Sequence, residues 1–333
     1  MRASHLRTLA ITTMTTIIAA FPVVALSQQA YPNRPVRIVA PFPPGNAADV
    51  VSRAMSDRLQ QRLGQPMVID NRVGGSGIIG VDSVAKAPPD GYTLLVTSLS
   101  PVTLLPAVFK TLPYDVERDF IPVALIGFTS MILVTAPTLP VNSVTELVAL
   151  AKANPGKYNY AHIGLGTISH LTMESLKLAM AVDIVGVPYK GSAQATTDLL
   201  GGQINLMFDG MTSAGTQVRA GKLKALAVTS QKRSPFAPGV ATMGDAGVAA
   251  MHDLNMIAWV GMFAPAGTPR AIIDRWHKEV SEIAVTPDVR ERLAAVSTEP
   301  APLESPAKFA EFHRNELTKW AKIAQSAGVF RSQ

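Results

Sequence analysis

Short runs of apolar and β-branched residues alternate with longer segments of helical periodicity along most of this chain. Runs at 36–41, 67–70 and 92–97 predict strands, and a segment of helical spacing follows each of the first two. Gly64 ends the first of these segments, whose apolar face consists of Val50, Val51, Ala54, Met55 and Leu59. Strands that alternate with helices are typical of an α/β fold with parallel strands.

The same alternation returns in the middle of the chain, where strands are predicted at 158–162, 184–188, 204–209 and 225–229. An extended apolar stretch, 122–127 and 131–135, precedes this second set, and residues 259–265 form a predicted return strand. Because the chain passes twice between two sets of elements, we expect two α/β lobes that are joined by two crossing strands around a ligand cleft.

The first thirty residues have the pattern of an export signal. Arg2 and Arg7 precede a largely apolar stretch, and Ala25-Leu26-Ser27 is a small-x-small site. We expect a signal peptide, cleaved after about Ser27, and a periplasmic mature protein; the alternative is a retained membrane anchor. The predicted division is a signal peptide at 1–27, a first lobe at 28–127 plus 256–333, and a second lobe at 128–255.

Composition narrows the possible functions. Apolar residues make up 47% of the 333 residues, and the absence of cysteine excludes disulfides, thiolate metal sites and a cysteine nucleophile. The formal charge is +6, from 30 Lys and Arg against 24 Asp and Glu, but the basic residues are scattered without aromatic interleaving. This distribution argues against nucleic-acid binding and gives only a weak attraction for anionic solutes.

Residues 75–80 form a GxGxxG pattern after a predicted strand, which is the local context of a dinucleotide site. However, the pattern follows the second strand, and Thr97 and Ser98 stand where the acidic ribose ligand is expected. Close packing of the backbone explains these glycines equally well. No GxSxG elbow is present either, and we expect neither a cofactor nor a metal.

The loop after the first strand is the first candidate site. A proline-stiffened turn leads into a helix at Asn46, which suits the N-cap, and Asp49 follows at capping-box spacing. The free N–H groups and the dipole of such a helix start favour an anion. The candidate ligand-binding residues here are Pro44, Gly45, Asn46, Ala47 and Asp49; the alternative is a purely structural turn.

A second strand-to-helix loop, at 161–170, has the same character. We expect the two helix starts to face each other across the cleft and to hold a diacid between them. The candidates in this loop are His162, Gly164, Gly166, Thr167, Ser169 and His170. His170 also suits a packing or capping role, and two histidines eight residues apart lack zinc spacing.

Weaker candidates follow three other strands. Asp209 could receive an ammonium or hydroxyl group of the ligand, or it could cap the next helix. Ser98 ends the third strand of the first set. Tyr189 and Lys190 either line the rim of the cleft or only shape the turn at Gly191.

Several blocks resemble those of one family in family order, over essentially the whole mature chain. The blocks are YPNRPVRIVAPFPPGNAADVVSR, GQPMVIDNRVGGSGIIG, KAPPDGYTLL, LPYDVERDFIPV, GLGTISHLTMESL, VPYKGSAQATTDLLGGQI, GKLKALAVTSQKRSP and WVGMFAPAGTP. The chain thereby resembles the Bug family, the substrate-binding proteins of tripartite tricarboxylate transporters.

The resemblance implies a periplasmic-binding-protein type II fold whose two lobes close over a carboxylate, held by backbone amides and ordered waters. It implies no enzyme activity, a monomer, and a two-subunit integral membrane transporter as partner; the alternative is a ligand sensor that docks on a signalling partner. The ligand could be a di- or tricarboxylate, an aromatic acid or an amino acid. Two positions depart from the family pattern: Asn46 replaces a usual glycine, and His162 replaces a small hydroxyl residue.

Overall fold

The computed structural model describes residues 31–302 and 304–332, so the expected signal segment 1–27 lies outside the described residues. Within the described part, the strands form two sheets. The first sheet has the order β11-β4-β10-β3-β1-β2, with bounds Glu299–Pro300, Phe120–Thr129, Ala258–Pro265, Thr93–Ser98, Val36–Ala40 and Met67–Asn71. The second has the order β7-β6-β8-β5-β9, with bounds Val185–Pro188, Asn159–His162, Leu206–Gly210, Met131–Thr135 and Lys224–Val228.

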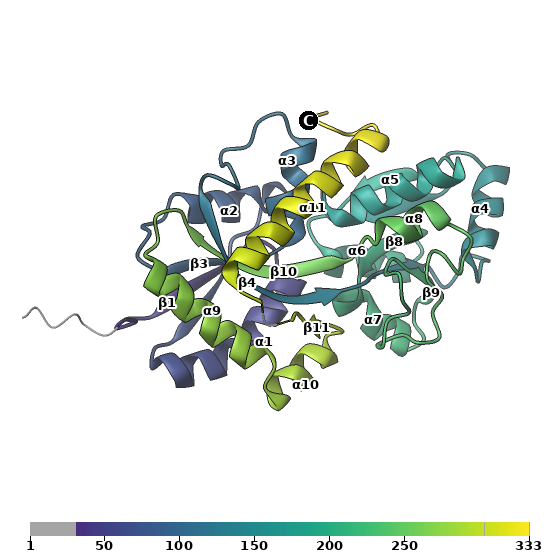
Figure 1. The fold of residues 1–333 in the computed structure, drawn as a ribbon. Helices are drawn as coiled ribbons and strands as arrows, with labels where there is room; N and C mark the ends of the chain where they lie inside the picture. The colour runs from purple at the N-terminus through teal and green to yellow at the C-terminus, as the bar shows by residue number, and fades with distance from the viewer. Residues whose placement is uncertain (1–30, 303, 333) are drawn as a thin grey trace, which may run out of the picture. The chain divides into compact units, whose positions relative to one another are not determined.

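Helices cover both sheets (Figure 1). Those associated with the first sheet are α1 (Ala47–Leu63), α2 (Ile78–Ala85), α3 (Leu105–Val108), α9 (Arg270–Ala284), α10 (Pro287–Ala295) and α11 (Pro306–Ser326). Those that follow strands of the second sheet are α4 (Val144–Ala153), α5 (Ile168–Met180), α6 (Ser192–Leu200), α7 (Met211–Arg219) and α8 (Ala249–Leu254). The mixed α/β fold with two sheets agrees with the predicted fold class.

The prediction of parallel strands is correct for only part of each sheet. Strand β1 pairs in parallel with β2 and β3, and β6 with β7 and β8. The long strand β10 pairs antiparallel with β3 and β4, and β5 pairs antiparallel with β8 and β9. The strands at the two passages between the sheets are therefore antiparallel to their neighbours, because each enters its sheet without a βα crossover.

Local signals explain why helix α1 begins and ends where it does. The Asn46 side chain accepts a hydrogen bond from the amide of Ala48, and Gly64 ends the helix in a left-handed conformation, as expected from the sequence. On the preceding strand, Val39 and Ala40 are fully buried, so β1 is held between helices on both faces. This fixed strand places the 41–46 loop at the carboxyl edge of the first sheet.

Only one residue, Ser130, separates β4 of the first sheet from β5 of the second. The return passage is longer and includes α8 before β10 begins. The hydroxyl of Thr229, at the start of this passage, donates to the carbonyl of Met256, and its oxygen accepts from the amide of Met131. The two passages are thus hydrogen-bonded to each other.

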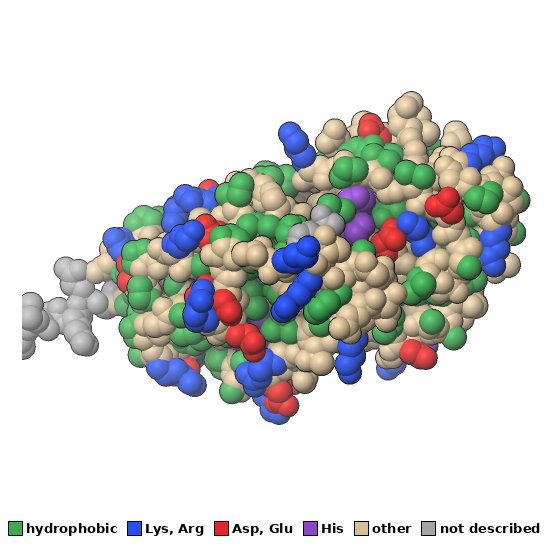
Figure 2. Space-filling model, turned by 90° about the horizontal axis from the view of Figure 1, so that it is seen from above, with side chains coloured by type: hydrophobic (Ala, Val, Ile, Leu, Met, Phe, Trp, Pro, Cys, Tyr) green, Lys and Arg blue, Asp and Glu red, His purple; other side chains and the backbone are tan. Residues whose placement is uncertain are grey.

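None of the described helices is both long enough and apolar enough to span a bilayer. Basic and acidic side chains are interspersed on the face seen in Figure 2. This surface agrees with the scattered charges of the sequence.

Candidate functional site

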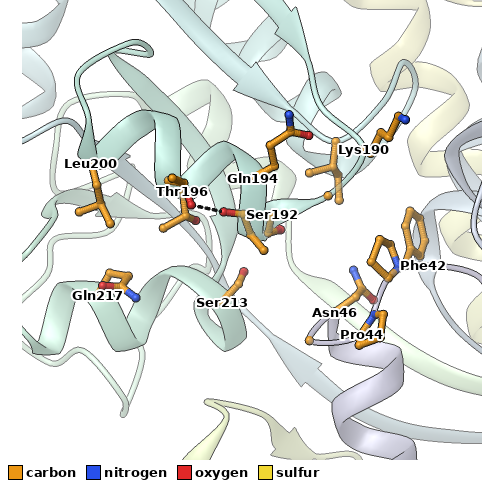
Figure 3. A pocket seen from close by; sticks show the side chains of 16 residues that line it. Phe42, Pro44, Asn46, Lys190, Ser192, Gln194, Thr196, Leu200, Ser213 and Gln217 are labelled. Carbon is orange, nitrogen blue, oxygen red and sulfur yellow. Dashed lines mark hydrogen bonds between the residues drawn. The ribbon is translucent and has the colours of Figure 1, made fainter.

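A cavity of about 470 Å³ lies between the 42–46 loop, helix α6 and helix α7 (Figure 3). Ser192 and Ser213 lie between the Phe42–Asn46 side and the Leu200 and Gln217 side of this view. The full lining consists of Phe42, Pro43, Pro44, Gly45, Asn46, Ile163, Lys190, Gly191, Ser192, Ala193, Gln194, Thr196, Thr197, Leu200, Ser213 and Gln217.

The start of α1 forms one wall, where hydrogen bonds within residues 43–49 satisfy the amides of Gly45, Asn46 and Ala48. Asp49 accepts a hydrogen bond from the amide of Gly45 at 3.0 Å, and Asn46 Oδ1 accepts from Ala48 at 3.1 Å. The amide of Asn46 donates to the carbonyl of Pro43. At the helix start, the amide of Ala47 has no acceptor among the described residues.

The start of α6 forms the opposite wall and is not capped by any side chain. Its N-cap is Gly191, and the first intrahelical bond runs from Ala195 to the Gly191 carbonyl. The amides of Ser192, Ala193 and Gln194 therefore have no carbonyl acceptor within the helix. Together with the helix dipole, they make this wall suitable for an anion.

The cavity surface carries little charge of its own. Of the described lining residues none is acidic, and Lys190 is the one with a permanent positive charge. In Figure 3 its side chain points away from Ser192 and Ser213. An anion here would therefore depend mainly on amide N–H groups.

Two buried carboxylates lie behind the cavity walls. Burial raises the pKa of Asp49, but hydrogen bonds from Arg53, Gly45 and Asn71 outweigh this effect and lower it below its usual value. Asp209 is completely enclosed, and burial raises its pKa despite hydrogen bonds from Ser213 and Ser192.

The structure therefore places the predicted site residues of the first loop in two groups. Pro44, Gly45 and Asn46 line the cavity, and Ala47 is the first residue of α1. Asp49 orients the loop from behind and does not line the cavity. Ser98 also lies off the cavity wall, because as the last residue of β3 it pairs with Val260 of β10.

Most of the second predicted loop lies outside this cavity. The amide of Ile168 donates to the Ser100 hydroxyl at 3.2 Å, so a side chain next to the first sheet occupies the start of α5. Gly164 and Gly166 pack closely against this same region, at Ser76 and Leu105 respectively. Thr167 and Ser169 are fully buried and hydrogen-bonded to each other. From this loop only Ile163 lines the cavity.

His162 and His170 hold this loop in place. Their Nδ1 atoms accept hydrogen bonds from the amides of Gly164 and Gly166, each at 3.3 Å, and their ring centroids are 4.8 Å apart. Burial lowers the pKa of both, that of His170 to about 4 with a further contribution from His162. Within the described residues no cluster of three metal-ligating side chains occurs.

The GxGxxG pattern has a packing role in this structure. A Cβ atom on Gly80 would lie 2.7 Å from Pro41 and 2.8 Å from the carbonyl oxygen of Arg72. Glycine at this position therefore allows α2 to approach the end of β1, as the packing interpretation of the sequence proposed.

Sequence reasoning missed the α6 start and the α7 residues Ser213 and Gln217. The available signal was the Lys190-Gly191-Ser192 turn after a predicted strand, where Lys190 was expected either to line the rim of the cleft or only to shape the turn. Tyr189 is turned away, since its hydroxyl donates to Asp198 at 2.7 Å.

Comparison with known families gives one match over most of the chain. The model of the tripartite tricarboxylate transporter family receptor, TctC, matches residues 51–329.

Solved structures with the same fold include three with similar sequences. The R. palustris protein Rpa4515 with adipate is 34% identical with a TM-score of 0.86, over 90% of this chain and 98% of that one. The periplasmic binding protein BugD is 34% identical with a TM-score of 0.85, over 90% and 99%. MatC from Rhodopseudomonas palustris, with bound malate, is 32% identical with a TM-score of 0.83, over 88% and 99%.

Proposed function

The chain belongs to the tripartite tricarboxylate transporter receptor family, and on that premise we propose that it is a solute-binding protein for a small carboxylate. The proposed ligand lies in the cavity between the start of α6 and the 42–46 loop, and the loaded protein delivers it to a membrane transporter. The protein acts by binding and release, without chemical change of the ligand.

The uncapped start of α6 carries this proposal. Its first three residues, whose amides have no helical acceptor, line a cavity whose described lining has no acidic side chain. The volume of about 470 Å³ is that of a site for a small organic molecule. The related structures with adipate and malate hold dicarboxylates, which supports the same ligand class here.

We further propose that the two sheets belong to two lobes, 28–127 plus 256–333 and 128–255, which close around the ligand. The cavity has walls from both, so a bound ligand favours the closed form. A periplasmic location agrees with the export pattern of residues 1–27 and with the description of BugD as a periplasmic binding protein.

A thermal-shift screen of the mature protein over carboxylates tests the proposal. A ligand that binds only the native state raises the melting temperature, by an amount that grows with its concentration relative to Kd. At least one carboxylate should do so, and isothermal titration should then give a single site. No shift with any carboxylate would contradict the proposal, whereas loss of uptake on deletion of the gene distinguishes transport from sensing.

Asn46→Asp is the variant that tests the position of the site. Aspartate caps a helix as well as asparagine, so α1 should be retained while the cavity gains a negative charge. We expect carboxylate affinity to fall at least about tenfold, because like charges about 5 Å apart repel by roughly 3 kcal/mol at an effective dielectric constant of about 20.

Ser305→Asp is the matched control. Ser305 caps α11 by accepting a hydrogen bond from the amide of Lys308, and it does not line the cavity. This variant adds the same charge to another helix start and should leave affinity unchanged. If carboxylate affinity falls equally in both variants, or falls in neither, the ligand binds elsewhere.

A further inference from the structure

Among the described residues, Asp209 is the one buried carboxylate whose side chain is hydrogen-bonded to two cavity-lining side chains. The hydroxyl of Ser192 donates to its Oδ1 at 2.8 Å, and the hydroxyl of Ser213 donates to its Oδ2 at 2.5 Å. Ser213 has a second acceptor in the carbonyl of Gly210 at 3.1 Å. Both serine protons are therefore directed into the protein and away from the cavity.

This arrangement decides what the serines can offer to a ligand. A hydroxyl has one hydrogen to donate and two lone pairs to accept with. Since each serine donates its hydrogen bond to Asp209, only the serine lone pairs remain to interact with a ligand in the cavity. A ligand group beside Ser192 and Ser213 must then be a hydrogen-bond donor, and a carboxylate oxygen or a methylene group is not one.

The donor groups of the α6 start lie next to these acceptors. Ser192 is the first residue of α6, so its amide belongs to the proposed anion site while its side chain accepts. A carboxylate at the amides brings the carbon next to it close to the two serine oxygens. A hydroxyl or ammonium group on that carbon is positioned to donate to them.

We propose that the Ser192–Asp209–Ser213 group selects carboxylates that carry a hydroxyl or amino substituent next to the carboxylate. The inference rests on the proposed function, and it adds a ligand class and the residues that determine it. Asp209 acts as a positioning residue, because it contacts the serines and does not line the cavity. When Asp209 is ionised, its charge further favours a positively charged amino group over a hydroxyl.

Matched acids test the selection. Each set contains an unsubstituted acid, its 2-hydroxy form and its 2-amino form, in both enantiomers: propanoate, lactate and alanine; succinate, malate and aspartate; glutarate, 2-hydroxyglutarate and glutamate; phenylacetate, mandelate and phenylglycine. Isothermal titration should show at least about tenfold tighter binding of one substituted form within the best-binding set. If no acid of any set binds, the proposed function fails; if acids bind without this preference, only the present inference fails.

Asp209→Asn tests the role of the carboxylate. The amide oxygen still accepts from one serine, but its NH₂ group donates to the other and occupies a lone pair that would otherwise accept from the ligand. We expect the preference to fall below about threefold, while the unsubstituted acid binds at least as tightly as before. A preference that stays at tenfold in a folded Asp209→Asn protein would overturn the proposal.

Ser213→Ala provides a second variant in case Asp209→Asn folds poorly. It removes one acceptor and should reduce the preference several-fold. The control is Ser175→Ala, since Ser175 is a buried serine whose hydroxyl donates to the Leu171 carbonyl away from the cavity. This control should keep the full preference, and an equal reduction in both serine variants would contradict the assignment.

Discussion

His162 and His170 were both candidate ligand residues, and a packing or capping role was the alternative for His170. In the structure both accept hydrogen bonds from amides of their own loop. The sequence placed them correctly around a strand-to-helix loop. It could not show that Ser100, far away in the chain, meets the start of the helix between them. The pair therefore stabilises the conformation of the 163–167 loop.

Because of the histidine pair, we expect the folded protein to lose stability at pH values above those at which carboxylates titrate. The pKa of His170 is lowered from 6.5 to about 4, chiefly by burial and by His162; Glu174 opposes this effect and Lys177 adds to it. Between these values the unfolded chain binds more protons than the folded one, so stability falls as the pH falls from about 6.5. Between pH 7 and pH 5 the loss from His170 should be about 2 kcal/mol.

Urea unfolding at several pH values measures this contribution. His170→Asn removes the titrating group, so its unfolding free energy should decline less between pH 7 and pH 5 than that of the unchanged protein. His313, whose pKa burial also lowers, contributes equally to both proteins. Parallel curves for the two proteins would contradict the assignment.

At the scale of elements, most boundaries follow from local signals. Ser143 and Ser305 cap α4 and α11 by accepting hydrogen bonds from the amides of Glu146 and Lys308, and α10 begins at Pro287. The segment 100–108 was not predicted as helical, and its prolines at positions 101 and 106 obscure the pattern. The antiparallel pairings of β5 and β10 were also not predicted. The direction of a strand depends on how the chain re-enters the sheet, and the residues of that strand alone do not show this.

Gly80→Ala tests whether close packing fixes the position of α2. Alanine favours a helix by about 1 kcal/mol over glycine, but here its Cβ would meet Pro41 and the Arg72 carbonyl. We expect a net destabilisation of about 1–3 kcal/mol in urea unfolding. The control is Gly239→Ala, which has open space around the added atom and should change stability by less than about 0.5 kcal/mol. A more stable Gly80→Ala protein would contradict the packing argument.

At the scale of the whole molecule, the resemblance seen in the sequence blocks is confirmed by the family match and by BugD. The fold class was therefore predictable, whereas the identity of the second cavity wall was not. Both the α5 and α6 starts follow strands of the second sheet, and only tertiary contacts decide which is covered. Ser100 occupies the first, and the second remains uncapped.

Closure of the proposed lobes is a prediction at this scale. The chain passes between the sheets at Ser130 and again in the segment before β10, and these two passages are where we expect the bending. Small-angle scattering of the mature protein should give a smaller radius of gyration with a bound carboxylate than without it. An unchanged radius at saturating ligand would count against closure.

The central claim is that a carboxylate binds at the start of α6. A crystal structure of the mature protein with its tightest-binding carboxylate tests this claim most directly. We expect a carboxylate oxygen within about 3 Å of the amide nitrogen of Ala193 or Gln194, with the rest of the ligand facing the 42–46 loop. A ligand found at the start of α5 beside Ile168, or outside this cavity altogether, would contradict it.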